Sequence, residues 1–192
     1  MKERTISRQI QDLSTFKLPA GLRGRPAWFV QIWEITQALF FHSSPHVLYG
    51  WRRFLLRLFG ARIGKCVMLR PSVTVTYPWK LSISDWSWIG EHVTLYTVGD
   101  ITIGENVVVS QHSYLCTSTH DCARTTFDTL VAPIHVESEA WLASNVFVGP
   151  GVTVGRGAVV GACSVVMKDV PEGMVCVGNP LKILRRRTEV HL

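Results

Sequence analysis

Residues 134–169 read IHVESE-AWLASN-VFVGPG-VTVGRG-AVVGAC-SVVMKD and divide into blocks of six residues. The position after the third residue of each block is often small, as at Gly149, Gly155 and Gly161. The third position is always aliphatic: Val136, Leu142, Val148, Val154, Val160 and Val166. A strict period of six matches neither the period of an α-helix, about 3.6 residues, nor the two-residue alternation of a simple strand. It predicts a solenoid in which each block adds one short strand and turns one aliphatic side chain inward.

The same phase continues toward the N-terminus. Aliphatic residues lie six apart in further runs: Ile63 and Leu69; Ile83, Ile89 and Leu95; Ile103, Val109 and Leu115. The longer step from Leu95 to Ile103 predicts a two-residue insertion near Val98-Gly99-Asp100. Three blocks make one coil of a triangular prism, with aliphatic residues inside and small residues at tight corners. We therefore expect an all-β solenoid, a parallel β-helix.

Three further features divide the chain. Residues 1–60 lack the hexad and are predicted to be a helical cap, residues 61–178 form the β-helix, and residues 179–192 are a basic tail. Within the tail, the stretch from Lys182 to Arg187 is short and basic, and a helix is one conformation open to it. Residues 117–133, TSTHDCARTTFDTLVAP, interrupt the hexads and are expected to protrude as a loop, because insertions into solenoids often build the binding site.

The cap is predicted to contain two amphipathic helices on either side of Ser43-Ser44-Pro45. Arg52, Arg53 and Arg57 lie on the side opposite the apolar stripe of the second helix. The apolar positions are Trp28, Phe29, Ile32, Ile35, Leu39 and Phe40, then Trp51, Phe54, Leu55, Leu58 and Phe59. A cover over the open end of the β-helix is the favoured interpretation, because solenoids need caps. A basic amphipathic surface on a membrane is the alternative, and the two are compatible.

Composition narrows the classes of partner and compartment. The net charge of +6 favours an anionic partner, but no nucleic-acid-binding signature accompanies the cluster Arg185 to Arg187, so nucleic acid is not expected. Residues 1–26 are polar and charged throughout, and no apolar stretch is long enough to span a bilayer, so we expect a cytoplasmic protein. The five cysteines are odd in number and contain no C-x-x-C pair, which indicates free thiols and no metal site.

Short motifs beside the repeat resemble a known family. Thr119-His120-Asp121, Ala140-Trp141-Leu142-Ala143 and Gly178-Asn179-Pro180, taken with the hexads, resemble the hexapeptide-repeat O-acetyltransferases. Within that family the chain is most similar to the colanic acid biosynthesis acetyltransferases of the maltose and galactoside acetyltransferase group, with which it shares Pro71 to Lys80. The resemblance implies a left-handed β-helix, a homotrimer, and acetyl-CoA bound in a groove between neighbouring subunits.

The resemblance also implies acetyl transfer to a sugar hydroxyl in exopolysaccharide biosynthesis. A sugar hydroxyl is almost fully protonated at neutral pH, so a base must remove its proton during attack, and histidine suits this role. Among seven histidines, His120 stands at the start of the inserted loop and matches the catalytic base of the family. Its other ring nitrogen needs a hydrogen-bond partner, for which Asp121, a backbone carbonyl and Glu91 are all open.

On the donor side, the resemblance implies that a backbone N–H near Ala143-Ser144 stabilises the oxyanion and that Trp141 walls the donor channel. Met167 stands where relatives often have threonine. Lys182 and Arg185 would meet the phosphate groups. The implied contacts to acetyl-CoA are Trp141, Ala143, Ser144, Ala162, Met167, Lys168, Lys182 and Arg185.

On the acceptor side, Glu91 matches an active-site asparagine of the maltose and galactoside enzymes, and Asp100 falls near an acceptor-binding carboxylate. Carboxylates are good acceptors for sugar hydroxyls. Tyr96, Asp121 and Arg124 complete the candidate acceptor site. The change from asparagine to Glu91 leaves the acceptor open, and a lipid-linked saccharide at the inner membrane face is one candidate.

Other functions remain as alternatives. An acetyltransferase with a different acceptor is the first alternative, and that acceptor could be an antibiotic, an amino sugar or serine. A γ-class carbonic anhydrase shares the β-helix but needs three histidines on zinc, and its H-x-x-x-x-H pairing is absent here. A noncatalytic solenoid would not need His120 in a loop or the Trp141 segment.

Overall fold

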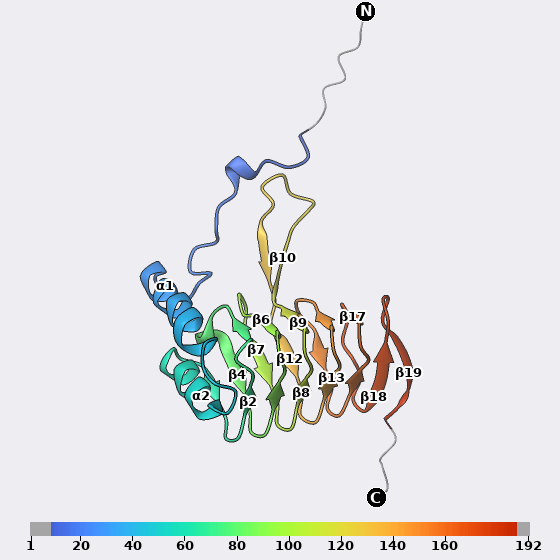
Figure 1. Cartoon of the computed structure of the whole chain (residues 1–192). Helices are drawn as coiled ribbons and strands as arrows, with labels where there is room; N and C mark the ends of the chain where they lie inside the picture. The colour runs from blue at the N-terminus through green and yellow to red at the C-terminus, as the bar shows by residue number, and fades with distance from the viewer. Residues whose placement is uncertain (1–8, 188–192) are drawn as a thin grey trace, which may run out of the picture.

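The computed structural model describes residues 9–187, and in this range the chain winds as a triangular prism of stacked coils. Two helices lie at one end of the stack and the C-terminal strands at the other (Figure 1). Each coil crosses three parallel sheets in turn, here named sheets A, B and C. The predicted parallel β-helix with an N-terminal helical cap is confirmed.

The three sheets are built from strands of two to five residues. Sheet A contains β1 (Arg62–Ile63), β4 (Leu81–Ile83), β7 (Ile101–Ile103), β12 (Ile134–Val136) and β15 (Thr153–Val154). Sheet B contains β2 (Met68–Leu69), β5 (Trp88–Ile89), β8 (Val108–Val109), β13 (Trp141–Leu142), β16 (Val159–Val160), β18 (Met174–Val177) and β19 (Lys182–Arg186). Sheet C contains β3 (Thr74–Val75), β6 (Thr94–Tyr96), β9 (Tyr114–Cys116), β14 (Phe147–Val148) and β17 (Val165–Val166).

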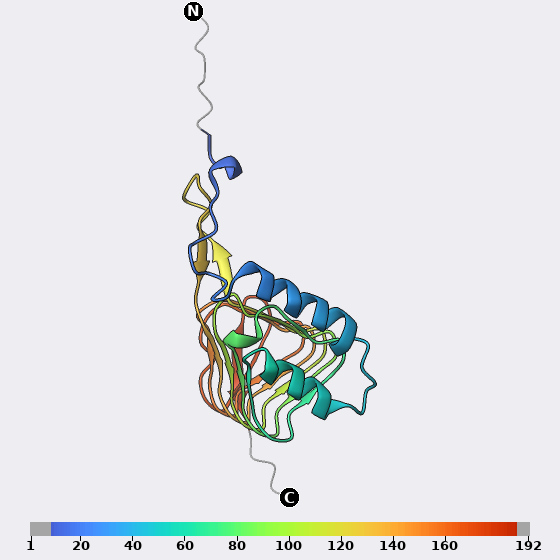
Figure 2. The same ribbon diagram turned by 90° about the vertical axis from the view of Figure 1, so that its left-hand side faces the viewer.

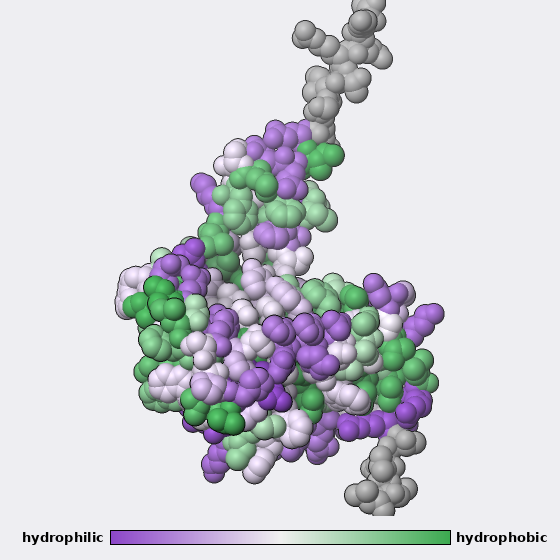
Figure 3. All heavy atoms as spheres, in the orientation of Figure 1, coloured by the Kyte–Doolittle hydropathy of each residue, from purple (hydrophilic) through white to green (hydrophobic). Residues whose placement is uncertain are grey.

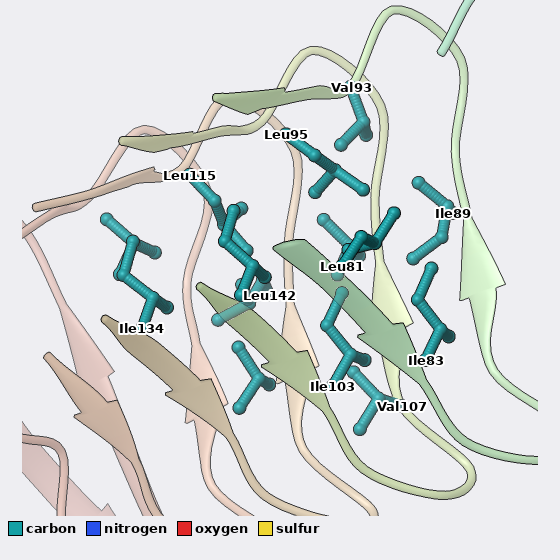
Figure 4. Packing of buried hydrophobic residues seen from close by; sticks show 14 of the residues in the cluster. Leu81, Ile83, Ile89, Val93, Leu95, Ile103, Val107, Leu115, Ile134 and Leu142 are labelled. Atoms are coloured by element: carbon teal, nitrogen blue, oxygen red, sulfur yellow. The ribbon is translucent and has the colours of Figure 1, made fainter. Parts of the chain in front are cut away.

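The aliphatic residue of each hexad points into the prism. The strand register pairs aliphatic residues of successive coils, as with Ile83 and Ile103 in sheet A and with Leu142 and Val160 in sheet B. The third-position residues from Val136 to Val166 are at most 1% exposed. Figure 4 shows Leu81, Ile83, Ile103 and Leu142 stacked along the interior. Burial of this column supplies most of the driving force for the fold, since each apolar side chain removed from water contributes about 1.5–3 kcal/mol.

Small residues at the corners let successive coils approach. A Cβ added to Gly90 would lie 2.7 Å from the Gln111 nitrogen of the next coil, and one added to Gly155 would lie 2.6 Å from the Glu172 nitrogen. These separations are shorter than a van der Waals contact, so glycine is required by the close approach of two backbones. The small residue that follows the aliphatic position in the repeat therefore has a steric cause.

The inserted residues 117–133 form an arm that projects from a corner between sheets C and A (Figure 1). Its stem is a pair of antiparallel strands, β10 (Ser118–His120) and β11 (Thr129–Val131), in which His120 faces Thr129. The protruding loop of the sequence analysis is thus a β-hairpin. The shorter insertion at Val98-Gly99-Asp100 lies at the same kind of corner, where Asp100 accepts a hydrogen bond from the Ile134 N–H at 3.0 Å.

The N-terminal helices lie across the end of the coils, as Figure 2 shows from that end. Residues Leu13–Thr15 form a short 3-10 turn, and a second one spans Pro78–Lys80. Helix α1 (Ala27–Thr36) continues into a π-helical turn (Gln37–Phe41), and α2 (Tyr49–Leu58) follows the expected break. Within residues 9–187, every helix falls short of the length and hydrophobicity that a bilayer-crossing helix requires.

Arginines of α2 face the coils. Arg52 Nε donates to the Leu69 carbonyl at 2.7 Å, Arg53 Nη1 to the Val67 carbonyl at 2.9 Å, and Arg57 Nη2 to the Ile63 carbonyl at 2.7 Å. These carbonyls belong to the first coil, which has no preceding coil to supply donors. Since buried backbone groups must be hydrogen-bonded, the arginine side chains take the place of the missing strand.

The basic C-terminal stretch is a strand, so the helix considered for Lys182 to Arg187 is wrong. Strand β19 (Lys182–Arg186) pairs antiparallel with β18 (Met174–Val177) and covers the last edge of sheet B. A strand is favoured here because β18 presents unpaired backbone groups that a helix would leave open.

Candidate active site

The arm holds His120 in one tautomer. His120 Nδ1 lies 2.9 Å from the Phe127 carbonyl oxygen. A carbonyl oxygen only accepts hydrogen bonds, so Nδ1 must carry the proton. The neutral ring then has its lone pair on Nε2, which is the form that a general base requires. Of the three partners left open by the sequence, the backbone carbonyl is the one that the structure brings to the ring.

Two phenylalanines hold the ring of His120. The Phe127 ring stacks on it at a centroid distance of 4.3 Å and an angle of 7°, and the Phe16 ring approaches at 6.0 Å and 59°. Phe16 belongs to the N-terminal segment, whose Asp12 N–H also donates to the Thr125 carbonyl at 2.8 Å. Sequence reasoning missed both phenylalanines. Phe127 lies seven residues after His120 in the inserted loop, whereas no local signal marks Phe16.

Asp121 and Arg124 stabilise the turn of the arm. Asp121 Oδ1 accepts a hydrogen bond from the Ala123 N–H at 3.0 Å, and Arg124 Nε lies 3.7 Å from Asp121 Oδ2. Arg124 Nη1 also bonds Asp128 Oδ2 at 2.8 Å, and this hydrogen bond lowers the pKa of Asp128. The two predicted acceptor residues therefore lie on the arm beyond His120 in contact with each other, with Arg124 exposed and Asp121 half-buried.

Ser144 lies at a corner between sheets B and C, and its backbone N–H is available. The neighbouring Ala143 N–H donates to the Val160 carbonyl at 2.9 Å, so the ladder between coils already uses it. In the part of the chain that the structure describes, the Ser144 N–H has no acceptor. Of the two residues considered for the oxyanion, only Ser144 can offer a donor.

Trp141 projects from the outer face of sheet B. Its ring is 44% exposed, and Nε1 donates to Ser110 Oγ at 3.0 Å. That hydrogen bond fixes the indole against the coil while one face of the ring stays open, as a wall for a flat or extended ligand requires. Ala162 lies exposed at the same kind of corner as Ser144, one coil further along.

The remaining donor residues gather near the C-terminal end of the prism. A hollow of about 310 Å³ there is lined by Met167, Lys168 and the Asn179-Pro180 turn among others. Met167 packs across Gly149, where an added Cβ would lie 2.6 Å from its sulfur. Lys182 and Arg185 are exposed on β19 beside this hollow.

The acceptor candidates are divided between two corners. Glu91 lies at a corner between sheets B and C, where its carboxylate is 3.5 Å from His46 Nε2. Asp100 lies at a corner between sheets C and A. Burial lowers the pKa of Lys80, and the negative charge of Asp100 partly offsets this lowering. Tyr96 lies between these corners on the outer face of sheet C, 6.0 Å from the ring of Tyr114. Burial raises the pKa of Tyr114 to about 12, so its phenol stays neutral.

One chain therefore does not bring all of its candidate residues together. His120 and Asp100 lie on the side of sheet C that adjoins sheet A, whereas Ser144, Ala162 and Glu91 lie on the side that adjoins sheet B. Within residues 9–187, no group of three histidine, cysteine, aspartate or glutamate side chains is arranged to hold a metal ion.

Fold and site together define a hexapeptide-repeat acyltransferase, and comparison with known proteins agrees. The chain is 55% identical over 180 residues to "Putative colanic acid biosynthesis acetyltransferase WcaF" of Escherichia coli (strain K12), covering 94% of this chain and 99% of that one. It is 29% identical over 149 residues to galactoside O-acetyltransferase of the same strain, covering 76% and 73% of the two chains. The chain belongs to the hexapeptide-repeat O-acetyltransferase family.

Two similar solved structures contain acetyl coenzyme A or coenzyme A. A hexapeptide-repeat acetyltransferase of Vibrio cholerae O1 biovar eltor, complexed with acetyl coenzyme A, matches with a TM-score of 0.75, 26% identity and 88% coverage of each chain. A galactoside acetyltransferase in complex with coenzyme A matches with a TM-score of 0.79 and 26% identity, covering 90% of this chain and 85% of that one. A comparison with models of known protein families finds no match.

Proposed function

We propose that this protein transfers the acetyl group of acetyl-CoA to a hydroxyl group of a sugar in an exopolysaccharide related to colanic acid. The observation that carries the proposal is the hydrogen bond from His120 Nδ1 to the Phe127 carbonyl, which leaves Nε2 as the base. The 55% identity to a protein named for colanic acid biosynthesis supports the class of acceptor. Galactoside O-acetyltransferase supports a sugar hydroxyl as the group that reacts.

His120 would act twice in the reaction. Its Nε2 accepts the proton of the sugar hydroxyl as the hydroxyl oxygen bonds to the thioester carbon. The Phe127 carbonyl stabilises the imidazolium that forms, because it accepts the proton on Nδ1. When the carbon–sulfur bond breaks, His120 returns the proton to the departing sulfur, so the products are the acetyl ester and free CoA.

The Ser144 N–H would stabilise the negative oxygen that develops on the thioester carbonyl. This donor is rigid because both flanking residues are tied into the coil: the Ala143 N–H bonds Val160 O at 2.9 Å and the Asn145 N–H bonds Gln111 O at 3.0 Å. A pre-oriented donor of this kind needs no rearrangement during reaction. Trp141, Ala162, Met167 and Lys168 would line the arm of the donor, and Lys182 and Arg185 would pair with its phosphates.

We propose that the active unit is a trimer with one site between each pair of subunits. The outer face of sheet A is polar, with Thr102, His135 and Thr153 in line, whereas sheet B presents Trp88 and Trp141, 52% and 44% exposed. Exposed aromatic side chains favour burial against another copy. Within one chain, His120 on the arm and the Ser144 corner lie on opposite sides of sheet C. In the trimer, a neighbouring copy would supply the Ser144 corner to the arm of the first.

The test is transfer of labelled acetyl groups from acetyl-CoA to a panel of hexoses, deoxyhexoses and exopolysaccharide fragments. Ester formation on a saccharide is the expected result, together with a rise in the melting temperature on adding CoA, because a ligand that binds the native state stabilises it. Absence of both transfer and stabilisation would reject the donor. Stabilisation by CoA with transfer only to amines or antibiotics would reject the acceptor.

Mixing two inactive variants tests whether the site is shared. Ser144→Pro removes the N–H and is expected to lose activity, whereas Ser144→Ala keeps the N–H and should retain it. If His120→Ala and Ser144→Pro subunits are unfolded and refolded together, about one quarter of sites should combine a wild-type His120 with a wild-type Ser144 and regain activity. Recovery near zero, with correctly sized mixed trimers, would place both residues of a site on one chain.

A further inference from the structure

The N-terminal cap has an apolar outer surface in addition to the one that packs on the coils. Val30, Trp33 and Phe41 are at most 5% exposed and face the prism. The opposite side of the same helices is also apolar. Together with Val47 and Leu48 of the connection before α2, its residues are here called the outer cap surface. They are Trp28, Ile32, Ile35, Leu39, Phe40, Val47, Leu48, Trp51, Phe54 and Leu58, which are 39% to 79% exposed. A surface helix normally keeps such a face polar, so this face indicates a contact with something else.

A hydrogen bond and a ring stack connect parts of the outer cap surface. Trp51 Nε1 donates to the Phe40 carbonyl at 2.9 Å, which joins α2 to the π-helical turn, and the Trp51 ring stacks on Phe54 at 5.7 Å. Figure 2 places α1 and α2 side by side across the end of the coils, and Figure 3 shows hydrophobic residues on the outside of this end. The surface therefore points away from the prism along its axis, whereas the candidate active site lies on its sides.

Charge is strongly divided along the chain. Ten of the twenty Lys and Arg residues lie between positions 13 and 84, with Glu34 as the single acidic residue there. Residues 85–192 contain seven basic and eleven acidic residues. Arg23, Arg25, Arg62 and Lys65 are exposed at this end of the molecule. An anionic surface is attracted to such an end, whereas the same end of a second copy is repelled by it.

We infer that the outer cap surface binds the anionic face of a lipid bilayer, with the helices lying in the plane of the headgroups. Tryptophan, phenylalanine and leucine surrounded by arginine and lysine are the composition of helices that lie in a membrane interface. Arg52, Arg53 and Arg57 of α2 donate hydrogen bonds to carbonyls of the first coil. Capping of the prism and binding of the membrane therefore depend on different side chains of the same helices.

The inference goes beyond the proposed reaction and combines with the proposed trimer. If the three prisms stand parallel to a common threefold axis, all three cap surfaces face the same way. Three weak contacts in one plane bind a membrane far more tightly than one. The active sites would then stand along the sides of the prisms, above a membrane that holds lipid-linked saccharides.

Flotation of the full-length protein with lipid vesicles tests the inference. Vesicles of phosphatidylcholine with phosphatidylglycerol should carry the wild type, and vesicles of phosphatidylcholine alone should carry less of it. The double variant Phe54→Glu, Leu58→Glu should bind the mixed vesicles about 10-fold or more weakly, since two apolar anchors are lost and two negative charges gained. Trp86→Glu is the matched control, because Trp86 is 58% exposed outside the cap.

Three outcomes would overturn the inference. They are failure of the wild type to float, equal flotation of the wild type and the double variant, and a doubled mass of the wild type in solution that the double variant abolishes, which would make a second copy the occupant. Acetyl transfer to a water-soluble saccharide is measured on the same samples. Unchanged transfer in the double variant would show that this variant folds. Absence of transfer in the wild type would count against the proposed reaction and not against binding to the membrane.

Discussion

Replacing His120 with alanine is expected to lower kcat for acetyl transfer by about 100- to 10,000-fold, the usual contribution of a general base. The side chain is exposed and contributes a ring stack with Phe127 and one hydrogen bond to its carbonyl, so the fold should survive the change. CoA should still raise the melting temperature of the variant, because the predicted donor contacts lie on sheet B, at the corners between sheets B and C and at the C-terminal end of the prism, and none of them is His120. The expected signature is therefore a loss in kcat with donor binding retained.

His135→Ala is the matched control for this experiment. His135 is exposed on the outer face of sheet A between Thr102 and Thr153, and none of the predicted donor or acceptor residues lies on that face. Its activity should equal that of the wild type within about twofold, as expected of a surface change remote from the site. Activity of His120→Ala close to that of the control would show that another group, or water, removes the proton.

Replacing Arg52 with leucine is expected to destabilise the protein by about 3–5 kcal/mol, because a buried hydrogen-bonding hub is lost. Arg52 is 0% exposed and has carbonyl and hydroxyl partners: Leu69 O at 2.7 Å, Ser44 Oγ at 2.8 Å, Pro45 O at 2.9 Å and His46 O at 2.6 Å. Burial lowers its pKa, and these acceptors offset the cost of holding the cation. Leucine fills space but leaves the acceptors without donors.

Urea denaturation at a fixed protein concentration measures this effect, because the stability of an oligomer depends on concentration. Arg62→Leu removes an exposed arginine from the first strand of the prism and should change stability by no more than about 0.5 kcal/mol. Arg52→Lys keeps the charge without the planar fork and should fall between the two. A loss below about 1 kcal/mol for Arg52→Leu would mean that water satisfies the four acceptors.

The candidate site was only partly predictable. His120 could be selected because it stands where the period of six stops, and an interruption in a regular repeat is visible in the sequence alone. Its hydrogen-bond partner could not, since Asp121 is adjacent in sequence yet turns toward Ala123 and Arg124. The carbonyl of Phe127 carries no side-chain signature, and the approach of Phe16 depends on the path of a segment more than 100 residues away.

The coiled body was determined by the sequence itself, because the period is local and repeated: each hexad must bury one aliphatic side chain, and only stacked coils satisfy all of them at once. Tertiary structure alone decided which face of the cap meets the coils. The periodicity of α2 distinguishes an apolar side from an arginine side, but the open carbonyls of Ile63, Val67 and Leu69 need donors, so the arginines also bond to the coils. The apolar stripe is divided as a result: Leu55 and Phe59 are buried in the core, whereas Trp51, Phe54 and Leu58 stay exposed. Unpaired backbone groups also explain why Lys182–Arg186 is a strand. The last edge of sheet B, at β18, leaves N–H and carbonyl groups without partners, and a strand can pair with them whereas a helix cannot.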